Sequence, residues 1–315
     1  MVSATGMAAV TQRSPLIPLD IAMLAYTAIT TVAALLFARD DAPGLGWFLV
    51  ANSLTVLVVF LAPRARAGGP VGRFVGDFYP LLLLAGTYSA VGLVTRPHGH
   101  PHDLAIQQLE QWLFGSQLSY RWIREMPNSV WSWYMHLSYL AYYPILSLPP
   151  LVLWLSGRRD AARTTMFGTL AALYACYVAF MFFPVAGPRY AFPLADNAAT
   201  HVWPARATQW LLNWGDSWGA AFPSSHVAGA VVATVCAIRF SRALGLVLLP
   251  WTIGLVFGVV YGQFHYAVDV LAGLAVAAGV LVALRVESWR VRPLETQPYR
   301  DRPPAHPSPA ETGSR

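Results

Sequence analysis

The feature that most constrains this sequence is a series of long apolar runs separated by short polar loops. A helix needs about 20 predominantly apolar residues to cross the hydrocarbon core of a bilayer. Hydrophobic residues make up 56% of the chain and charged residues only 11%, which excludes an ordinary soluble globular fold. The runs that fit spanning helices are 17–38, 45–61, 74–94, 130–155, 162–183, 222–240, 244–261 and 266–286. The sequence therefore predicts an all-α, polytopic membrane helical bundle with about eight transmembrane helices.

Polar and flexible stretches divide the chain into four segments. These are a disordered N-terminus (1–16), an N-terminal helix pair (17–62), a six-helix core (74–286) and a disordered cytoplasmic tail (287–315). The basic, Gly- and Pro-containing connector Pro63–Pro70 separates the helix pair from the core. Within the core, 95–129 mixes apolar and polar residues, so we expect one or two amphipathic helices at the membrane surface. Pro149 and Pro150 are expected to kink or end the helix at 130–155.

The distribution of arginine predicts the orientation of the bundle. The sequence contains no lysine, and its arginines lie in short loops and the tail, which favours a topology signal over nucleic-acid binding. Eight spans place both termini on one side, where fifteen arginines lie, against six on the other side. Because cytoplasmic loops are enriched in basic residues, we expect cytoplasmic termini in a bacterial-type plasma membrane.

Two polar residues begin the last apolar run, His265 and Asp269. Four residues apart at a helix start, they share one face. A carboxylate beside an imidazole can fix its tautomer and stabilise the imidazolium, which leaves the other ring nitrogen free as a nucleophile. A simple ion pair at a helix start is the alternative interpretation.

A second polar group, Ser224-Ser225-His226, follows Pro223 at the start of another apolar run. A helix N-terminus offers free N–H groups and a partial positive charge, which suit a phosphate group. The alternative is a serine-capped helix start without further function. Arg189, in the loop after the run at 162–183, can hold phosphate oxygens bidentately or lie at a headgroup boundary. The predicted topology opens all of these loops on the outer face, where we expect the active site.

Three further polar residues are candidates for the lining of a substrate cavity. Tyr190 follows Arg189 directly, whereas His136 and Asp77 lie within predicted spans. Polar groups that face lipid are costly, so His136 and Asp77 either line the cavity or make interhelical polar contacts.

The loop at 96–103 alternates His98, His100 and His102 with Gly and Pro. Such a tract can bind metal adventitiously, but no fixed ligand spacing supports a site, and a solvated loop is the favoured interpretation. We expect neither a metal nor a cofactor.

The string His265-Tyr266-x-x-Asp269-Val270-x-x-Gly273, with Pro223-Ser224-Ser225-His226 upstream, resembles the type 2 phosphatidic acid phosphatase superfamily. The His-Tyr-x-x-Asp-Val string is most similar to the branch of inositol phosphorylceramide and sphingomyelin synthases, and the resemblance covers roughly 74–286. It implies that His265 attacks phosphorus to form a phosphohistidine and that Asp269 orients it. It further implies that His226 is the general acid and base, and that Ser224, Ser225 and Arg189 hold the phosphoryl oxygens. No metal is implied.

The sequence also departs from the superfamily's pattern. Phe182 stands where the pattern has Lys, Tyr190 where it has Pro, and Ser225 where it has Gly. Gly258 and Val259 stand where it has Ser-Arg. Arg206 is a candidate replacement for the missing cations, although its position does not match the motif.

These departures favour a headgroup phosphotransferase that acts on a lipid phosphoester and passes the phospho-headgroup to a polyol or lipid alcohol. A lipid or polyprenyl phosphate phosphatase, with water as acceptor, is the close alternative. A non-enzymatic membrane protein with a degenerate site is the alternative of another class. The partners implied are the lipid substrate and the bilayer; nucleic acid is not among them, and the sequence leaves the oligomeric state open.

Overall fold

A computed structural model describes residues 16–37, 44–95 and 102–290 of the chain. Within these ranges 81% of the residues are helical and no strand is present, which confirms the predicted all-α polytopic bundle. The two segments predicted to be disordered lie almost entirely outside the described residues. At their inner edges Leu16 packs against the core, and the last helix continues to Arg290.

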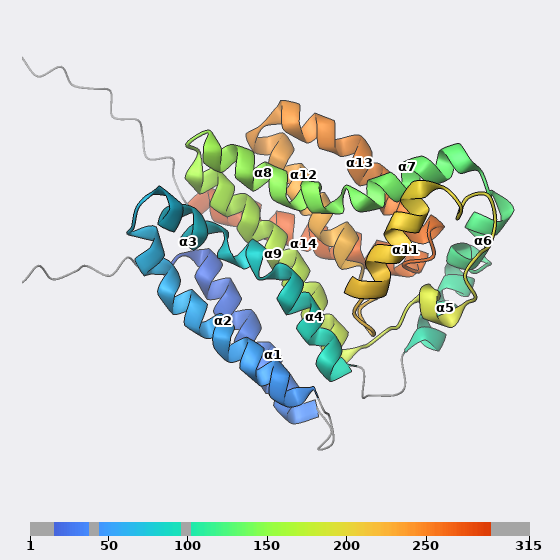
Figure 1. Ribbon diagram of the computed structural model, residues 1–315, viewed down its shortest axis with the longest axis horizontal. Coiled ribbons are helices and arrows are strands. Elements are labelled where there is room, and N and C mark those ends of the chain that lie inside the picture. Colours follow the sequence, from blue (N-terminus) through green and yellow to red (C-terminus); the bar gives the residue numbers. More distant parts are fainter. Residues whose placement is uncertain (1–15, 38–43, 96–101, 291–315) are drawn as a thin grey trace, which may run out of the picture.

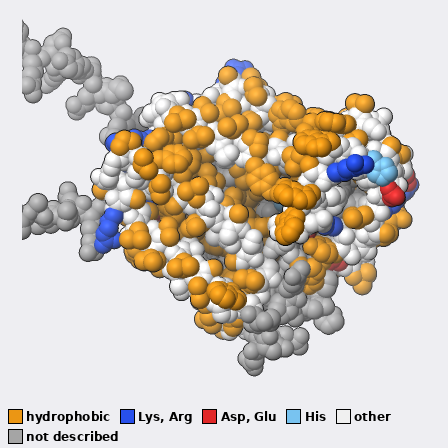
Figure 2. All heavy atoms as spheres, viewed as in Figure 1, with side chains coloured by type: hydrophobic (Ala, Val, Ile, Leu, Met, Phe, Trp, Pro, Cys, Tyr) orange, Lys and Arg blue, Asp and Glu red, His pale blue; other side chains and the backbone are white. Residues whose placement is uncertain are grey.

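Six helices or helix pairs are long and apolar enough to cross a membrane. They are α1 (Pro18–Phe37), α2 (Leu45–Arg66), the joined α3 (Pro70–Leu82) and α4 (Leu84–Thr95), α9 (Arg159–Phe182), α13 (Arg242–Tyr261) and α14 (Ala267–Arg290). Figure 2 shows that hydrophobic side chains cover most of the viewed face, with arginines near its two ends. The protein is therefore an integral membrane protein.

The two remaining predicted spans differ from simple helices. α7 (Ser129–Leu140) and α8 (Tyr142–Leu155) form a pair bent by 46°, which makes a seventh span if the pair crosses as one. The bend lies at Ala141, and α8 continues through Pro149 and Pro150, so the predicted place of the kink was wrong. Pro144 explains the position, because its ring clashes with the carbonyl four residues earlier, at Leu140. α12 (Ser225–Phe240), at 16 residues, is shorter than the other spans.

α12 can be short because it lies in the centre of the bundle, packed against α8, α9, α13 and α14. Its inward faces carry small residues that let neighbouring helices approach closely. A Cβ atom at Gly229 would lie 2.8 Å from the Leu173 side chain of α9. The helix that begins with the Ser-Ser-His motif is thus held on several sides by other helices.

The remaining helices do not span the bundle. The segment predicted to be amphipathic forms two of them, α5 (Asp103–Phe114) and α6 (Leu118–Glu125), which Gly115 separates in a left-handed conformation with φ +67°. The loop between α9 and α12 contains the short α10 (Pro188–Ala191) and α11 (Trp203–Gly215). Figure 1 shows α5 and α6 at the end of the molecule opposite the α2–α3 turn.

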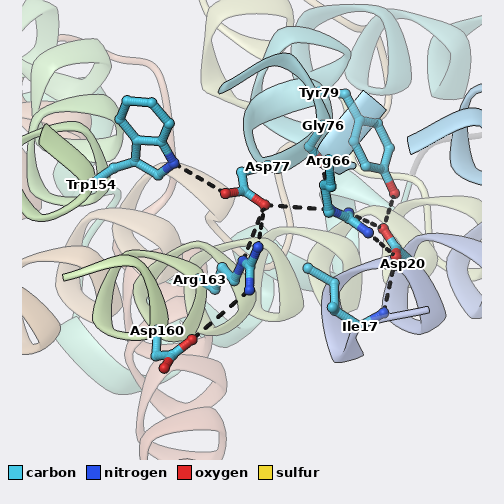
Figure 3. Close-up of polar contacts among 9 residues, drawn as sticks. All are labelled: Ile17, Asp20, Arg66, Gly76, Asp77, Tyr79, Trp154, Asp160 and Arg163. Atoms are coloured by element: carbon cyan, nitrogen blue, oxygen red, sulfur yellow. Dashed lines mark hydrogen bonds and ion pairs between the residues drawn. The ribbon is translucent and has the colours of Figure 1, made fainter. Parts of the chain in front are cut away.

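A buried ion-pair network joins the N-terminal helix pair to the core (Figure 3). The guanidinium of Arg66, on α2, donates two hydrogen bonds of 2.6 Å to the carboxylate of Asp20, on α1. The Tyr79 hydroxyl donates to the same carboxylate at 2.9 Å. Arg66 Nε also lies 3.3 Å from Asp77 Oδ1 on α3, so one arginine connects three helices.

Asp77 continues the network into the core. Its Oδ1 accepts hydrogen bonds from Arg163 of α9, the shorter 2.8 Å long, and its Oδ2 accepts from the Trp154 indole of α8 at 3.0 Å. Asp77 is only 1% exposed. A buried carboxylate is stable only when it is paired in this way.

Substitution of Asp77 by asparagine should therefore lower the free energy of unfolding by about 3–5 kcal/mol, because Arg66 and Arg163 would lose a buried counter-charge. Denaturation in detergent micelles measures this change. Asp160→Asn is the matched control, since Asp160 is fully exposed and lies 3.9 Å from the same Arg163. Equal stability of the two variants would contradict a role of the network in joining the helices.

Candidate active site

The two polar motifs meet at the N-termini of α12 and α14. Ser224 is the N-cap of α12, and its hydroxyl accepts a hydrogen bond from the Val227 N–H. The Ser224 N–H donates to the Asp269 carbonyl at 2.9 Å. A Cβ atom at position 273 would lie 2.5 Å from the Ser224 carbonyl oxygen, so only glycine permits this approach of the two helices.

The turn before α14 presents His265 to the start of α12. Gln263 has a left-handed backbone with φ +61°, which is uncommon for a residue with a side chain. Its buried side chain stabilises the turn, because Oε1 accepts hydrogen bonds from the Ala195 N–H and from Arg124, both at 3.2 Å. His265 lies two residues later and is only 4% exposed.

The imidazole of His265 has a defined set of partners. Its Nδ1 lies 2.9 Å from the Ala221 carbonyl oxygen and 3.4 Å from Asp269 Oδ2. Because a carbonyl can only accept, Nδ1 carries the proton and the Nε2 lone pair is free. Nε2 faces His226 Nδ1 at 3.4 Å, and His226 Nε2 lies 3.2 Å from the Tyr139 hydroxyl. An imidazole nitrogen with an available lone pair therefore lies beside a second titratable group.

Asp269 has a second contact besides the one with His265. Its Oδ2 accepts a hydrogen bond of 2.8 Å from the Tyr266 N–H, and the side chain is fully buried. The carboxylate therefore caps the start of α14 while it lies beside Nδ1 of the imidazole. The closest partner of Nδ1 is the Ala221 carbonyl oxygen, a backbone group that no side-chain motif in the sequence reveals.

Arg189 comes to the same site from the loop after α9. Gly187, with φ +96°, lets the chain turn into α10, and a Cβ atom there would lie 3.0 Å from the Ala221 side chain. The guanidinium donates to Gln209 Oε1 at 2.6 Å and to Asn213 Oδ1 at 2.5 Å, one turn apart on α11. The arginine is thus held by two neutral acceptors that do not cancel its charge.

A carboxylate that the sequence did not single out completes the polar part of the site. Asp216 Oδ2 lies 4.0 Å from Arg189 Nε and accepts a hydrogen bond of 3.0 Å from the Tyr190 hydroxyl. Its Oδ1 accepts from the Tyr88 hydroxyl at 3.4 Å. Asp216 follows α11 without a motif, so only the tertiary structure reveals it.

These residues line one small polar pocket. Its walls include Tyr88, Tyr139, Arg189, Asp216, His226 and His265. A larger cavity of about 440 Å³ shares Tyr88, Tyr139, Leu212 and His226 with the pocket. The walls of this cavity are mostly tyrosines and leucines of α3, α4, α7, α8, α9 and α11, so a polar group can bind beside the histidines while an apolar chain occupies the cavity.

The other predicted site residues lie in different surroundings. Ser225 is buried and lines the larger cavity, whereas Tyr190 contacts the pocket through Asp216. His136 Nδ1 contacts the Ser132 hydroxyl at 3.0 Å within α7, and Asp77 belongs to the ion-pair network. His136 and Asp77 therefore make polar contacts within the helix bundle and do not line the larger cavity.

The missing cations of the motif have no evident replacement in the pocket. Gly258 packs so closely that a Cβ atom there would lie 2.6 Å from the Met135 carbonyl oxygen, and Val259 is buried. Phe182 is 53% exposed. Neither Arg206 nor these positions line the polar pocket, where Arg189 supplies the positive charge.

Two further sequence predictions concern the histidine-containing loop at 96–103 and metal binding. His98 and His100 lie outside the described residues, and the His102 ring stacks on Phe183 with centroids 4.1 Å apart. Across the described ranges, no group of three or more His, Cys, Asp or Glu side chains is arranged to hold a metal ion.

Comparison with known proteins gives one family. The model of the PAP2 superfamily matches residues 104–283, which is more than half of the chain and includes both motifs, α5 and the Arg189 loop. No curated protein matches the chain, and no solved structure matches it.

Proposed function

The chain belongs to the PAP2 superfamily, and from this we propose that it is a membrane-embedded phosphotransferase that acts on a lipid phosphoester through a phosphohistidine. Membership of the superfamily supports a phosphatase or phosphotransferase type of activity. The observation that carries the more specific proposal is the contact between His265 Nε2 and His226 Nδ1 beside Arg189.

The proposed reaction has two balanced steps. His265 Nε2 attacks phosphorus, the bond from phosphorus to the leaving oxygen breaks, and His226 gives that oxygen a proton. The acceptor hydroxyl then gives its proton to His226, its oxygen attacks phosphorus, and the bond from phosphorus to nitrogen breaks. Asp269 Oδ2, 3.4 Å from Nδ1, stabilises the positive charge that the imidazole gains.

The two imidazoles contact one another at 3.4 Å. A phosphoryl group between them needs more room, so one ring has to turn when substrate binds. His226 is the ring that we expect to turn, because His265 is held by both Ala221 and Asp269.

The larger cavity supports a lipid as substrate. Its lining includes His226 together with Tyr88, Tyr142, Leu81 and Leu146. A phosphoester in the polar pocket would place the apolar chain of the same molecule in this cavity. We therefore assign the cavity to the hydrocarbon part of the substrate.

Asp216 favours transfer between alcohols over hydrolysis of a phosphomonoester. A carboxylate 4.0 Å from Arg189 reduces the positive potential that a dianionic monoester requires. A phosphodiester carries a single negative charge, and Asp216 can accept hydrogen bonds from hydroxyl groups of a polyol. A reaction resembling that of inositol phosphorylceramide synthases fits this pocket better than a lipid phosphatase does.

The experiment is to supply purified protein in lipid nanodiscs with labelled phospholipid donors, with and without alcohol acceptors. We expect the label to appear in a new phosphodiester, in an amount that increases with the acceptor concentration. Release of inorganic phosphate from lipid phosphates at a rate unaffected by inositol or other alcohols would contradict transfer and favour the phosphatase alternative.

Arg189→Lys should lower kcat about 100-fold, because a point charge cannot replace a guanidinium oriented by two side chains. Steady-state rates with a fixed donor measure this effect. Arg206→Lys is the matched control, since Arg206 does not line the polar pocket. This variant should keep the wild-type kcat. An equal loss in both variants would contradict the assignment of Arg189 to phosphate binding.

A further inference from the structure

The non-spanning helix α5 presents a polar face to the candidate active site. Asp103, Gln107 and Glu110 are spaced by four and three residues, so they share one side of the helix. Glu110 is fully buried and Asp103 is 8% exposed. Buried carboxylates are retained only where they are well paired, and the structure shows that their partners are the loops of the site.

Asp103 joins the Arg189 loop to the His265 loop. Its Oδ2 accepts a hydrogen bond from the Ala186 N–H, and its Oδ1 accepts from the Gly187 N–H, both at 2.8 Å. The same Oδ1 accepts from the Tyr266 hydroxyl at 2.9 Å. The carboxylate of Asp103 is thus hydrogen-bonded to Gly187, two residues before Arg189, and to Tyr266, one residue after His265.

Gln107 and Glu110 hold the second of these loops. The Gln107 amide donates to the Tyr266 hydroxyl at 2.8 Å. Glu110 Oε2 accepts a hydrogen bond of 2.7 Å from the Ala267 N–H, a free donor at the start of α14. Glu110 Oε1 accepts from the Leu118 N–H at 2.9 Å, which also fixes α6.

The buried carboxyl of Glu110 acts here as an acceptor from the backbone. Burial raises the pKa of Glu110, and hydrogen bonds from the backbone of Ser119, Ala267 and Leu118 oppose this rise. The carboxylate also lies at the positive end of the α14 helix dipole, which favours its ionised form.

We propose that Asp103 and Glu110 are positioning residues, which set the place of the Arg189 guanidinium relative to the His265 imidazole. The inference rests on the proposed function and extends it, since neither residue belongs to the histidine motifs or touches the polar pocket. The alternative is that the two carboxylates only attach α5 to the bundle. The alternative predicts lost stability, whereas positioning predicts lost turnover in a folded protein.

The experiment compares Asp103→Asn, Glu110→Gln and Tyr266→Phe in full-length protein in nanodiscs. Glu125→Gln on α6 is the matched control, because its side chain is 55% exposed. Each of the three variants should lower kcat about 10- to 100-fold and change KM less than about threefold, since a small misplacement of reacting groups mainly affects the transition state. Asp103→Asn combined with Tyr266→Phe should lose less kcat than the product of the two single losses, because the two variants share the bond between Asp103 and Tyr266.

Amide hydrogen exchange provides a readout that does not depend on catalysis. Exchange at Gly187 should become faster in Asp103→Asn, and exchange at Ala267 in Glu110→Gln, while both variants remain folded at the assay temperature. A kcat within twofold of wild type in both variants would overturn the proposal. Losses of kcat that only follow the fraction of unfolded protein would also overturn it.

The experiments distinguish a failure of the proposed function from a failure of the positioning role. If wild-type protein processes no lipid phosphoester, the proposed function is wrong, and the exchange data alone then decide whether Asp103 and Glu110 hold the two loops. If wild-type protein is active and exchange at Gly187 and Ala267 is unchanged in the variants, the positioning role is wrong while the proposed function remains.

Discussion

His265→Ala is expected to abolish turnover of lipid phosphoesters, with a loss of at least about 10⁴-fold in kcat. The imidazole is the group whose free nitrogen faces the pocket, because Ala221 and Asp269 lie at its Nδ1. No other side chain in the pocket can replace a nucleophile held in that position. Initial rates with a labelled donor lipid measure the loss, and mass spectrometry of quenched wild-type enzyme should detect the phospho-headgroup on His265.

The matched control is His201→Ala, since His201 is 60% exposed and pairs with Asp196 on the loop before α11. It should keep the wild-type rate. A lipid profile of cells carrying His265→Ala that is identical to that of wild-type cells would favour a non-enzymatic protein with a degenerate site.

The fold could be predicted well because the lengths of apolar runs depend on the bilayer alone. Each predicted span has a helix in the structure, and the family match confirms the resemblance to the superfamily, although the branch stays a proposal. The errors concern contacts between elements. The bend at Ala141 comes from Pro144, whereas Pro149 and Pro150 continue a helix that its neighbours hold in place.

The candidate site could be predicted only where its residues belong to a local sequence pattern. His265 and Asp269 share a face by helical spacing alone, whereas Asp216 and Tyr139 come from other elements without any local pattern. Asp77 shows a case in which the sequence left two interpretations open. An acidic residue in a span has the same sequence signal whether it lines a cavity or pairs with Arg66 and Arg163, so only the tertiary structure separates the two.

His226→Ala should slow the first step, cleavage of the bond from phosphorus to the leaving oxygen, about 10²- to 10⁴-fold for a lipid donor, and far less for an aryl phosphoester. A lipid alkoxide is a poor leaving group and needs a proton as its bond to phosphorus breaks, whereas a nitrophenolate leaves without one. In the structure His226 Nδ1 faces the nucleophile at 3.4 Å, and the Tyr139 hydroxyl lies 3.2 Å from Nε2. This arrangement puts the imidazole that donates the proton beside the nucleophile, in contact with the Tyr139 hydroxyl on its other side.

The second step makes the test sharper, because the same imidazole must take the proton of the acceptor. With an aryl donor, His226→Ala should therefore release a burst of nitrophenolate close to one equivalent and then accumulate phosphorylated His265. Tyr139→Phe, which keeps the imidazole and removes only its neighbour's hydroxyl, should show a smaller loss and no burst. If His226→Ala instead slows the first step by the same factor for lipid and aryl donors, His226 acts in binding. Proton transfer then has to be assigned to another group in the pocket.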